Sequence, residues 1–531
     1  RQRSIRDMMH LRPLDMKRGI IHLYKICILF SDTEFEHDVY ELIRAFYPEA
    51  ELQSLYEPSE EAEKERDLFF RIEKKEDQNV FIHYKGEERS GVISAQMIQG
   101  QSKDALISCD TKSKAFDGHS LRKENKDILK LALYQLLVKL TGKTLPWGNL
   151  TGIRPAKLAM GMLEEGKSNV EAAKEMRERY MVSPQKAALA ITIANREREI
   201  LKNIDYENGY SLYVGIPFCP SICLYCSFSS YPLKQWKHQV DAYLDALCKE
   251  IQAVSSMMKG RKLDTIYIGG GTPTTLEPDQ LRRLLTQLGE SFGYDGIEEF
   301  TVEAGRPDSI TKEKLLALRE FPVGRISVNP QTMNQKTLEL IGRRHTVEET
   351  KQAFFMAREC GFDNINMDLI VGLPGEDRLM VEHTLSQVKA LSPDSLTVHS
   401  LAVKRAARLN MFKDQYQEMT FENNQEIMDL TMKTAYEMGM GPYYLYRQKN
   451  MKGNFENVGY AKVDKAGIYN ILIMEEKQPI LALGAGGSSK LVFDHGKRIE
   501  RVENVKDVTN YITRIEEMIQ RKQTGIATWL S

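Results

Sequence analysis

The chain has few cysteines, no long apolar run and no excess of charge of either sign. Seven cysteines among 531 residues are too few, and odd in number, for a disulfide scaffold, which indicates a reducing compartment. No apolar run approaches the roughly 18 residues of a membrane-spanning helix. A formal net charge of -1 offers no basic surface for nucleic acid. The sequence therefore predicts a cytoplasmic protein without a membrane span and without a nucleic-acid partner.

The apolar stretch 20–30 follows several arginines, a pattern that faintly resembles a secretory signal peptide. His22 and Lys25 interrupt it, and no small-residue cleavage site follows. We therefore predict a strand at this position.

Length alone predicts two to four domains, and the apolar pattern divides the chain into four parts. Residues 1–122 combine short β-rich runs with a helical segment, which predicts an N-terminal α/β domain. Helical periodicity marks 123–205 as a helical linker region. Strict strand–helix alternation follows over 206–404, and the mixed tail 405–531 is expected to form a small C-terminal α+β domain.

Six strands are legible in the third part, at 211–216, 264–268, 299–303, 324–328, 364–371 and 395–399. Helical segments lie between them, and such alternation predicts a parallel sheet with right-handed crossovers. A closed barrel of eight units needs about 250 residues, which is more than this region has. We therefore predict an α/β fold with an open, partial (β/α)6 TIM-like barrel.

Three cysteines stand together directly after the first of these strands: Cys219, Cys223 and Cys226, in the spacing C-x-x-x-C-x-x-C. Four thiolates normally hold a 4Fe–4S cluster, so three in one loop can leave one iron open to a ligand. The plainer alternatives are structural thiols or part of a zinc site. Zinc sites favour paired C-x-x-C units, and no second pair occurs. An open cluster is the favoured interpretation.

Polar or glycine-rich residues also follow the other five strands, where parallel α/β folds place their sites. They are Gly269–Thr274, Glu303, Gln331 with Arg343, Asp368 before Gly372, and His399 with Ser400. Each has a plainer alternative as a turn, a solvated strand end, a surface charge or a core histidine. No G-x-G-x-x-G or P-loop spacing occurs, so a dinucleotide or nucleoside triphosphate site is not predicted. The recurrence at every strand end favours an active site.

One loop outside the barrel is open to two interpretations. The segment 146–155 breaks a helical region with Pro and Gly and carries Trp147 and Arg154. It is either a ligand-contacting loop or, more simply, a packed linker.

These motifs resemble the radical S-adenosylmethionine (SAM) superfamily, and within it the oxygen-independent coproporphyrinogen III oxidase family. The segments that carry the resemblance are Tyr-x-x-Ile-Pro-Phe-Cys at 213–219, Gly-Gly-Gly-Thr-Pro-Thr at 269–274 and Asp-Leu-Ile-x-Gly-Leu-Pro at 368–374. The segment 150–155 and the long N-terminal extension are similar to the HemZ-like branch, the coproporphyrinogen dehydrogenase HemZ group.

The resemblance implies two cofactors, a 4Fe–4S cluster and SAM, and a role for each matching residue. It implies Cys219, Cys223 and Cys226 as cluster ligands, which with Tyr213 form the catalytic set. Arg343 would pair with the SAM carboxylate, a task that suits its fork. The implied SAM-binding residues are Tyr213, Tyr225, Gly270, Gly271, Thr272, Glu303, Gln331, Arg343, Asp368 and Ala402.

The reaction implied by the resemblance is that of an anaerobic oxidoreductase of porphyrin and haem biosynthesis. Such an enzyme uses the cluster to cleave SAM to a 5′-deoxyadenosyl radical. It then converts propionates of coproporphyrinogen III to the vinyl groups of protoporphyrinogen IX. The electron would come from a reductant such as flavodoxin or ferredoxin. Related branches leave two alternatives open: a haem-degrading or haem-modifying enzyme that opens the ring or transfers methyl groups, and a haem chaperone.

Several positions depart from the decarboxylating members of the family. Phe228 stands where those members carry a fourth cysteine, and Gly215 where they usually have His. Asn329 and Pro330 replace Gly and Val before the glutamine. These changes concern the tetrapyrrole substrate and any second SAM more than the cluster.

A short basic run follows the sixth strand. Lys404, Arg405 and Arg408 are candidates for contacts with substrate carboxylates. A solvated basic surface is the alternative.

Overall fold

The computed structural model describes residues 24–31, 33–59, 66–74, 79–86, 90–96, 118–152, 154–228, 230–402, 407, 422–448 and 455–531. The chain divides into two compact units, 1–145 and 146–531. The boundary lies inside the stretch 123–205 that the sequence suggests as a linker. The reason is that α3 (Gly118–Thr141) packs Leu129, Leu133 and Leu137 into the core of the first unit.

The first unit is a five-stranded sheet in the order β2-β1-β3-β4-β5. Its strands are β1 (Lys25–Phe30), β2 (Glu51–Leu55), β3 (Leu68–Lys74), β4 (Asn79–Gly86) and β5 (Ser90–Gln96). β1 pairs in parallel with β2 and β3, and β3, β4 and β5 are antiparallel. Helix α1 (Glu36–Phe46) buries Val39, Leu42 and Ile43 in the same core as α3, because the three residues recur at helical spacing.

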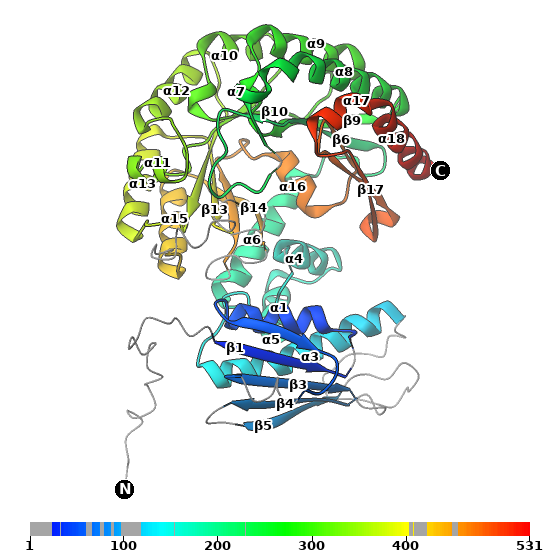
Figure 1. The fold of residues 1–531 in the computed structure, drawn as a ribbon, viewed down its shortest axis with the longest axis vertical. Helices are drawn as coiled ribbons and strands as arrows, with labels where there is room; N and C mark the ends of the chain where they lie inside the picture. The colour runs from blue at the N-terminus through cyan, green and yellow to red at the C-terminus, as the bar shows by residue number, and fades with distance from the viewer. Residues whose placement is uncertain are drawn as a thin grey trace. The chain divides into compact units, whose positions relative to one another are not determined.

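The second unit contains the predicted partial barrel. Its six parallel strands are β6 (Gly209–Ile216), β9 (Lys262–Gly270), β10 (Glu299–Gly305), β11 (Arg325–Val328), β12 (Ile365–Val371) and β13 (Ser395–Ser400). The main crossover helices are α8 (Val240–Met257), α9 (Pro278–Phe292), α10 (Lys312–Arg319), α12 (Val347–Glu359) and α13 (Arg378–Leu391), and they follow the outer side of the curved sheet (Figure 1). The described strands form an open sheet with β14 and β18 at its edges.

The C-terminal part extends this sheet instead of folding apart from it. β16 (Ile480–Leu483) runs parallel to β6, followed by antiparallel β17 (Ser488–Phe493) and β18 (Arg498–Glu503). At the other edge, β15 (Asn457–Ala461) pairs with β13 and with β14 (Gly441–Tyr446). All four residues of β16 are apolar and buried, so this strand needs cover on both faces and a paired edge.

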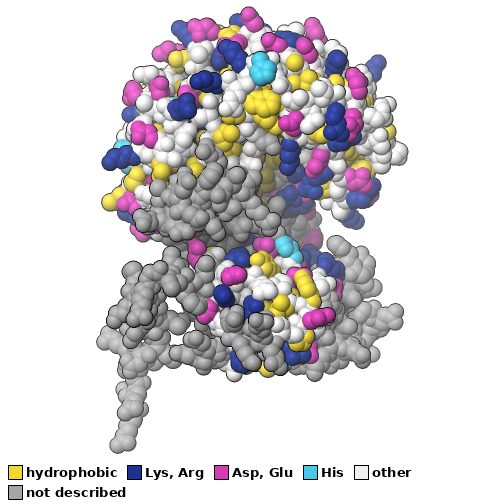
Figure 2. Space-filling model, viewed as in Figure 1, with side chains coloured by type: hydrophobic (Ala, Val, Ile, Leu, Met, Phe, Trp, Pro, Cys, Tyr) yellow, Lys and Arg dark blue, Asp and Glu magenta, His cyan; other side chains and the backbone are white. Residues whose placement is uncertain are grey.

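The described part of this unit contains further helices. They are α4 (Pro155–Glu164), α5 (Asn169–Glu178), α6 (Pro184–Ile200), α7 (Leu233–Trp236), α11 (Gln335–Leu340), α15 (Gln425–Glu437), α16 (Ile468–Glu475), α17 (Val508–Thr513) and α18 (Ile515–Leu530). None of the helices in the described part of the chain combines the length and apolar character that crossing a bilayer requires. Charges of both signs are interspersed over the face shown in Figure 2.

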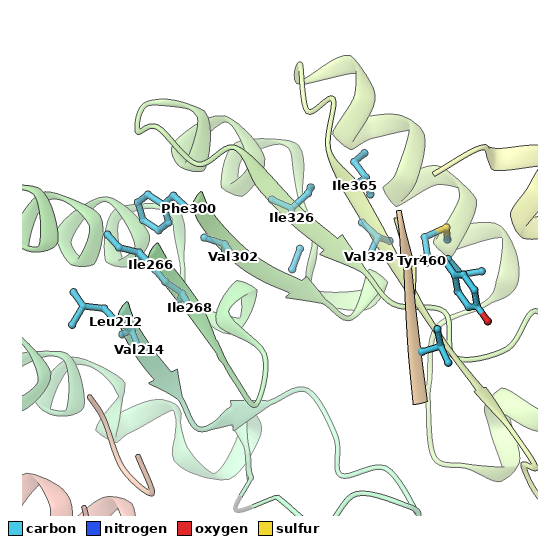
Figure 3. Packing of buried hydrophobic residues seen from close by; sticks show 14 of the residues in the cluster. Leu212, Val214, Ile266, Ile268, Phe300, Val302, Ile326, Val328, Ile365 and Tyr460 are labelled. Atoms are coloured by element: carbon cyan, nitrogen blue, oxygen red, sulfur yellow. The ribbon is translucent and has the colours of Figure 1, made fainter. Parts of the chain in front are cut away.

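The barrel strands alternate between an apolar outer face and a polar inner face. Leu212, Ile266 and Phe300 stand opposite one another on β6, β9 and β10, and they belong to the buried core that Figure 3 shows from close by. Since successive strand residues point to opposite faces, the residues that follow them, beginning with Tyr213 and Tyr267, face inward. Because of this alternation, polar side chains of the strands lie in the interior of the barrel.

Candidate functional site

The cysteine loop lies at the carboxyl end of β6 and is anchored on both sides. Cys219 ends the short strand β7 (Phe218–Cys219), which pairs with β8 (Tyr231–Pro232). The Leu224 amide donates to the Ile341 carbonyl at 2.9 Å, and the Cys226 amide donates to the Cys223 carbonyl at 3.2 Å. The three cysteines are therefore held in one turn beside the barrel mouth.

The thiols of this loop are buried or half-buried and have polar neighbours. Burial raises the pKa of the Cys219 thiol to about 11 and raises that of Cys226. The Thr272 hydroxyl lies 3.6 Å from the Cys219 sulfur. Within the described residues, no three His, Cys, Asp or Glu side chains are grouped closely enough to hold a single metal ion. A cluster differs from such a site because it spreads its thiolates over several irons.

The triple glycine brings bare backbone against this loop. A Cβ atom on Gly271 would lie 2.5 Å from the Phe218 carbonyl oxygen and 3.0 Å from the Cys219 sulfur. Gly270 has a φ of +107°, which side-chain-bearing residues rarely adopt. The Thr272 amide donates to the Phe218 carbonyl at 2.8 Å. Glycine is thus required here by close approach and not only by a turn.

Glu303 lies on the inner face of β10 beside a stack of tyrosines. The Tyr267 hydroxyl donates a short hydrogen bond to its carboxylate. The rings of Tyr267 and Tyr469 are stacked 4.5 Å apart, and Tyr213 lies 6.3 Å from each. Burial raises the pKa of Glu303 to about 7, against the lowering effect of the Tyr267 hydrogen bond.

Two members of this stack were not predicted from the sequence. Tyr267 precedes the triple glycine by two residues, so the strand period of two would have placed it on the inner face. Tyr469 comes from α16, and no local pattern connects it with β9.

Gln331 combines a strained backbone with an unpartnered side chain. Its φ is +67°, a value uncommon for a residue other than glycine, asparagine or aspartate. Its amide donates to the Asp368 carbonyl and its carbonyl accepts from Ile370, both at 2.9 Å. Its buried Oε1 has no hydrogen-bond partner in the described part of the protein. Such strain and such an unpaired buried oxygen are typical of ligand sites.

Arg343 is buried between the cysteine loop and the strand ends. It donates to the Asn329 carbonyl, and the nearby Tyr225 and Cys223 side chains act to raise its pKa against the effect of burial. Its Nε has no hydrogen-bond partner among the described residues. One edge of the guanidinium is therefore left, at Nε, without an acceptor in the described part of the protein.

Asp368 lies on the inner face of β12, beside Asn366 of the same strand and His399 of β13. It accepts from the Asn366 amide at 2.7 Å, and the His399 Nε2 lies 3.8 Å from its other oxygen. The Tyr446 hydroxyl lies 3.3 Å from the His399 Nδ1. Although burial acts to raise it, the contacts with His399 and Asn366 hold the pKa of Asp368 below its usual value. Asp368 is thus kept as a carboxylate.

The other predicted residues lie at the same end of the sheet, with one group outside the described residues. Tyr225 is half-buried in the cysteine loop, and the half-buried Ala402 follows β13. Lys404, Arg405 and Arg408 lie outside the described residues.

The loop that contains Trp147 is a packed connection. The indole is fully buried and donates to Glu456 at 2.7 Å, and the same carboxylate accepts from Lys186 at 2.7 Å. Arg154 forms a short ion pair with Glu476. Both side chains are used to join this loop to the C-terminal part of the same unit.

Comparison with known proteins shows the family. Residues 213–388 match the model of the radical SAM superfamily. The chain is 41% identical over 404 residues to the oxygen-independent coproporphyrinogen-III oxidase-like protein HemZ of Bacillus subtilis, covering 75% of this chain and 81% of that protein.

Two further relatives match over a shorter length of the chain. The haem chaperone HemW of Bacillus subtilis is 40% identical over 195 residues, which are 36% of this chain and 51% of that protein. The oxygen-independent coproporphyrinogen III oxidase of Escherichia coli is 36% identical over 196 residues, or 37% of this chain and 42% of that protein. The chain thus spans about half the length of these two relatives.

The site fits the two cofactors of the superfamily, a 4Fe–4S cluster and SAM. Three buried or half-buried thiols stand in one loop, and the Cys219 sulfur lies against the bare backbone of Gly271. The unpaired Arg343 Nε and Gln331 Oε1 offer a donor and an acceptor to a zwitterionic ligand. The chain belongs to the radical SAM superfamily, in the HemZ-like branch of the oxygen-independent coproporphyrinogen III oxidase family.

Proposed function

We propose that this protein is a radical SAM oxidoreductase that acts on a tetrapyrrole, and that it decarboxylates propionates of coproporphyrinogen III without oxygen. The observation that carries the proposal is the position of the cysteine loop, which opens onto the polar interior of the barrel beside Glu303, Gln331 and Asp368. The 41% identity to the coproporphyrinogen-III oxidase-like protein HemZ over most of both chains supports the tetrapyrrole class.

Cys219, Cys223 and Cys226 would hold the cluster, and the buried residues around them would hold SAM. When bound, the two cofactors supply hydrogen-atom abstraction by a 5′-deoxyadenosyl radical. The free edge of Arg343 would bind the SAM carboxylate. The glycine backbone at 270–271 and Thr272 would line the methionine part, with Tyr213 and Tyr225 at its sides.

Two different carboxyl groups at the strand ends would bind the ribose hydroxyls of SAM. Asp368 is held ionised and accepts hydrogen bonds, whereas Glu303, with a pKa of about 7, is partly protonated near neutral pH and can also donate one. The surrounding tyrosine rings exclude water from this position, which protects a reactive intermediate from side reactions.

The reaction requires one protein that donates an electron to the cluster and one acceptor that takes an electron from the substrate. A propionate side chain that loses a hydrogen atom releases carbon dioxide and passes one electron to an acceptor as the vinyl group forms. A small electron-transfer protein such as flavodoxin or ferredoxin would reduce the cluster.

Two other functions stay in competition with this one. A radical enzyme that opens or methylates haem would use the same cofactors. A haem carrier would keep the cluster without turnover, and the 40% identity to a haem chaperone over 195 residues favours including it.

Anaerobic incubation of the reconstituted protein with SAM, dithionite and coproporphyrinogen III separates the three. We expect deoxyadenosine together with a vinyl-containing product by chromatography and mass spectrometry. In a parallel incubation with haem in place of coproporphyrinogen III, deoxyadenosine together with loss of the haem would support the haem-modifying enzyme instead. Haem binding without turnover of either tetrapyrrole would support the carrier.

The cluster assignment has a separate test with a matched control. The triple variant of Cys219, Cys223 and Cys226 to Ala should lose the iron, the sulfide and the visible absorbance of the cluster. The control replaces Cys248 and Cys360, which lie on α8 and at the end of α12, with Ala, and should load normally. Retention of four irons by the triple variant would refute the assignment.

A further inference from the structure

Arg306 is a buried cation that contacts the cysteine loop and has no role in the site described so far. It follows β10 directly, and its side chain is 4% exposed. Its Nη1 lies 3.6 Å from the Cys223 sulfur and 3.1 Å from the Ser221 carbonyl oxygen. The guanidinium therefore reaches one of the three thiols and the backbone of the same turn.

The opposite edge of this guanidinium is fixed by a carboxylate. Its Nε and Nη2 donate to the two oxygens of Asp308 at 3.0 and 2.8 Å, a bidentate pair. The Arg306 carbonyl accepts from the Ser309 amide at 2.9 Å, which fixes the turn that carries both residues. Because the two edges are held at once, Arg306 has little freedom to leave Cys223.

The charges around Cys223 are arranged asymmetrically. Arg306 hydrogen-bonds with Cys223, the Arg343 charge lies near the same thiol, and Asp308 lies on the far side of Arg306 from the sulfur. His345 lies 3.8 Å from Asp308, and burial, with the nearby Arg343 charge, lowers its pKa to about 3, so the imidazole adds no charge. The sulfur of Cys223 is thus in contact with positive charge, and the compensating negative charge is more distant.

The reduction potential of an iron–sulfur cluster depends on net charge, burial and hydrogen bonds to its sulfurs. Reduction by one electron makes the cluster and its three thiolates more negative by one unit. A buried cation in hydrogen-bond contact with a thiolate stabilises that added charge, and a nearby carboxylate opposes it.

We propose that Arg306 and Asp308 together set the reduction potential of the cluster: Arg306 raises it through Cys223, and Asp308 limits the increase. The pair acts as a positioning and tuning element and touches neither SAM nor substrate. The proposal rests on the assignment of the cluster to the three cysteines and is independent of the tetrapyrrole.

Three variants test the proposal. Two of them should move the reduction potential of the cluster in opposite directions, and the third should leave it unchanged. Arg306→Gln removes the charge and retains an amide donor, Arg306→Lys retains the charge, and Asp308→Asn removes the opposing carboxylate. Each is reconstituted in the full chain, its iron and sulfide are counted, and its midpoint potential is measured by EPR-monitored titration with dithionite, without SAM or substrate. Arg282→Gln, on the exposed face of α9, is the control for loss of an arginine.

We expect a more negative potential in Arg306→Gln, a more positive potential in Asp308→Asn, and values close to the parent protein in Arg306→Lys and the control. Equal potentials in all fully loaded variants would overturn the proposal and assign the pair to loop structure alone. If Arg306→Gln fails to load, Asp308→Asn still decides, because an unchanged or more negative potential there contradicts the charge argument. Failure of the parent protein to load would instead refute the cluster assignment.

Discussion

Two buried polar clusters in the second unit differ in how completely their groups are paired. In the first, both oxygens of Glu250 are used: one accepts from Asn504 and Lys522, the other from the Gly484 amide and the Tyr511 hydroxyl, at 2.6–2.8 Å. At the barrel mouth, by contrast, Gln331 Oε1, Arg343 Nε and both ring nitrogens of His345 have no hydrogen-bond partner within the described residues.

The difference separates a structural cluster from a binding site. Buried polar groups in proteins are nearly always paired, so a fully paired cluster stabilises the fold and has no capacity for a ligand. The Glu250 cluster joins α8, α17, α18 and the turn after β16 in this way. We expect a bound ligand to complete the unpaired groups at the strand ends.

The largest effect is expected when the paired cluster is broken. Glu250→Gln removes the negative charge opposite Lys522, whose side chain is 1% exposed. An uncompensated buried charge costs about 3–5 kcal/mol, so the thermal unfolding midpoint should fall strongly. Glu290→Gln, at an exposed position on α9, is the control and should unfold like the parent protein.

A double variant sharpens this result. Glu250→Met combined with Lys522→Met removes both charges, and it should recover much of the stability lost in the single variant. If the single variant is as stable as the parent protein, the paired Glu250 cluster does not stabilise the fold, and the distinction drawn between the two clusters is wrong.

A smaller, pH-dependent effect is expected from Glu303. Its folded-state pKa of about 7 lies above the value of about 4.3 for an exposed glutamate, so the folded state retains a proton that the unfolded state releases between these values. The free energy of unfolding should therefore fall as the pH rises through this window, by on the order of 3–4 kcal/mol.

Glu303→Gln removes this dependence, because the amide does not ionise. The midpoint of the variant relative to the parent protein should rise between pH 5 and pH 8, measured by scanning calorimetry without cofactors. A constant difference across that range would show that Glu303 titrates like an exposed carboxyl group.

The smallest effect on stability is expected at Gln331. Gln331→Gly suits the φ of +67° and removes an unpaired buried oxygen, so the free energy of unfolding should change by no more than about 1 kcal/mol. SAM affinity, measured by calorimetric titration of the reconstituted protein, should nonetheless fall at least tenfold. Strong destabilisation with unchanged SAM affinity would place Gln331 among the structural residues.

The local patterns of the sequence predict much of this molecule. The six barrel strands follow from strand–helix alternation, and the cysteine loop follows from its spacing. The positions of Glu303, Gln331 and Asp368 at strand ends follow from the rule that parallel sheets place their sites there. These predictions depend on neighbours along the chain, which a single sequence displays directly.

Other features depend on contacts between distant segments and were not predicted. Tyr469 reaches Tyr267 across about 200 residues, and β16 joins β6 although the tail had been expected to form a domain of its own. The contact of Arg306 with Cys223 also joins separate loops. Positive φ at Gln331 is unpredictable for another reason, since no glycine marks the position.

The pairing of β6 with β16 has a consequence for how the protein is made. β6, which precedes the cysteine loop, pairs on one side with β9 and on the other with β16, which follows all six barrel strands in the sequence. A ribosome completes β6 and its cysteines long before β16 emerges, so one edge of that strand stays unpaired during most of synthesis of the second unit. A segment translated long after the cysteine loop is therefore the one that pairs with the open edge of the strand before it.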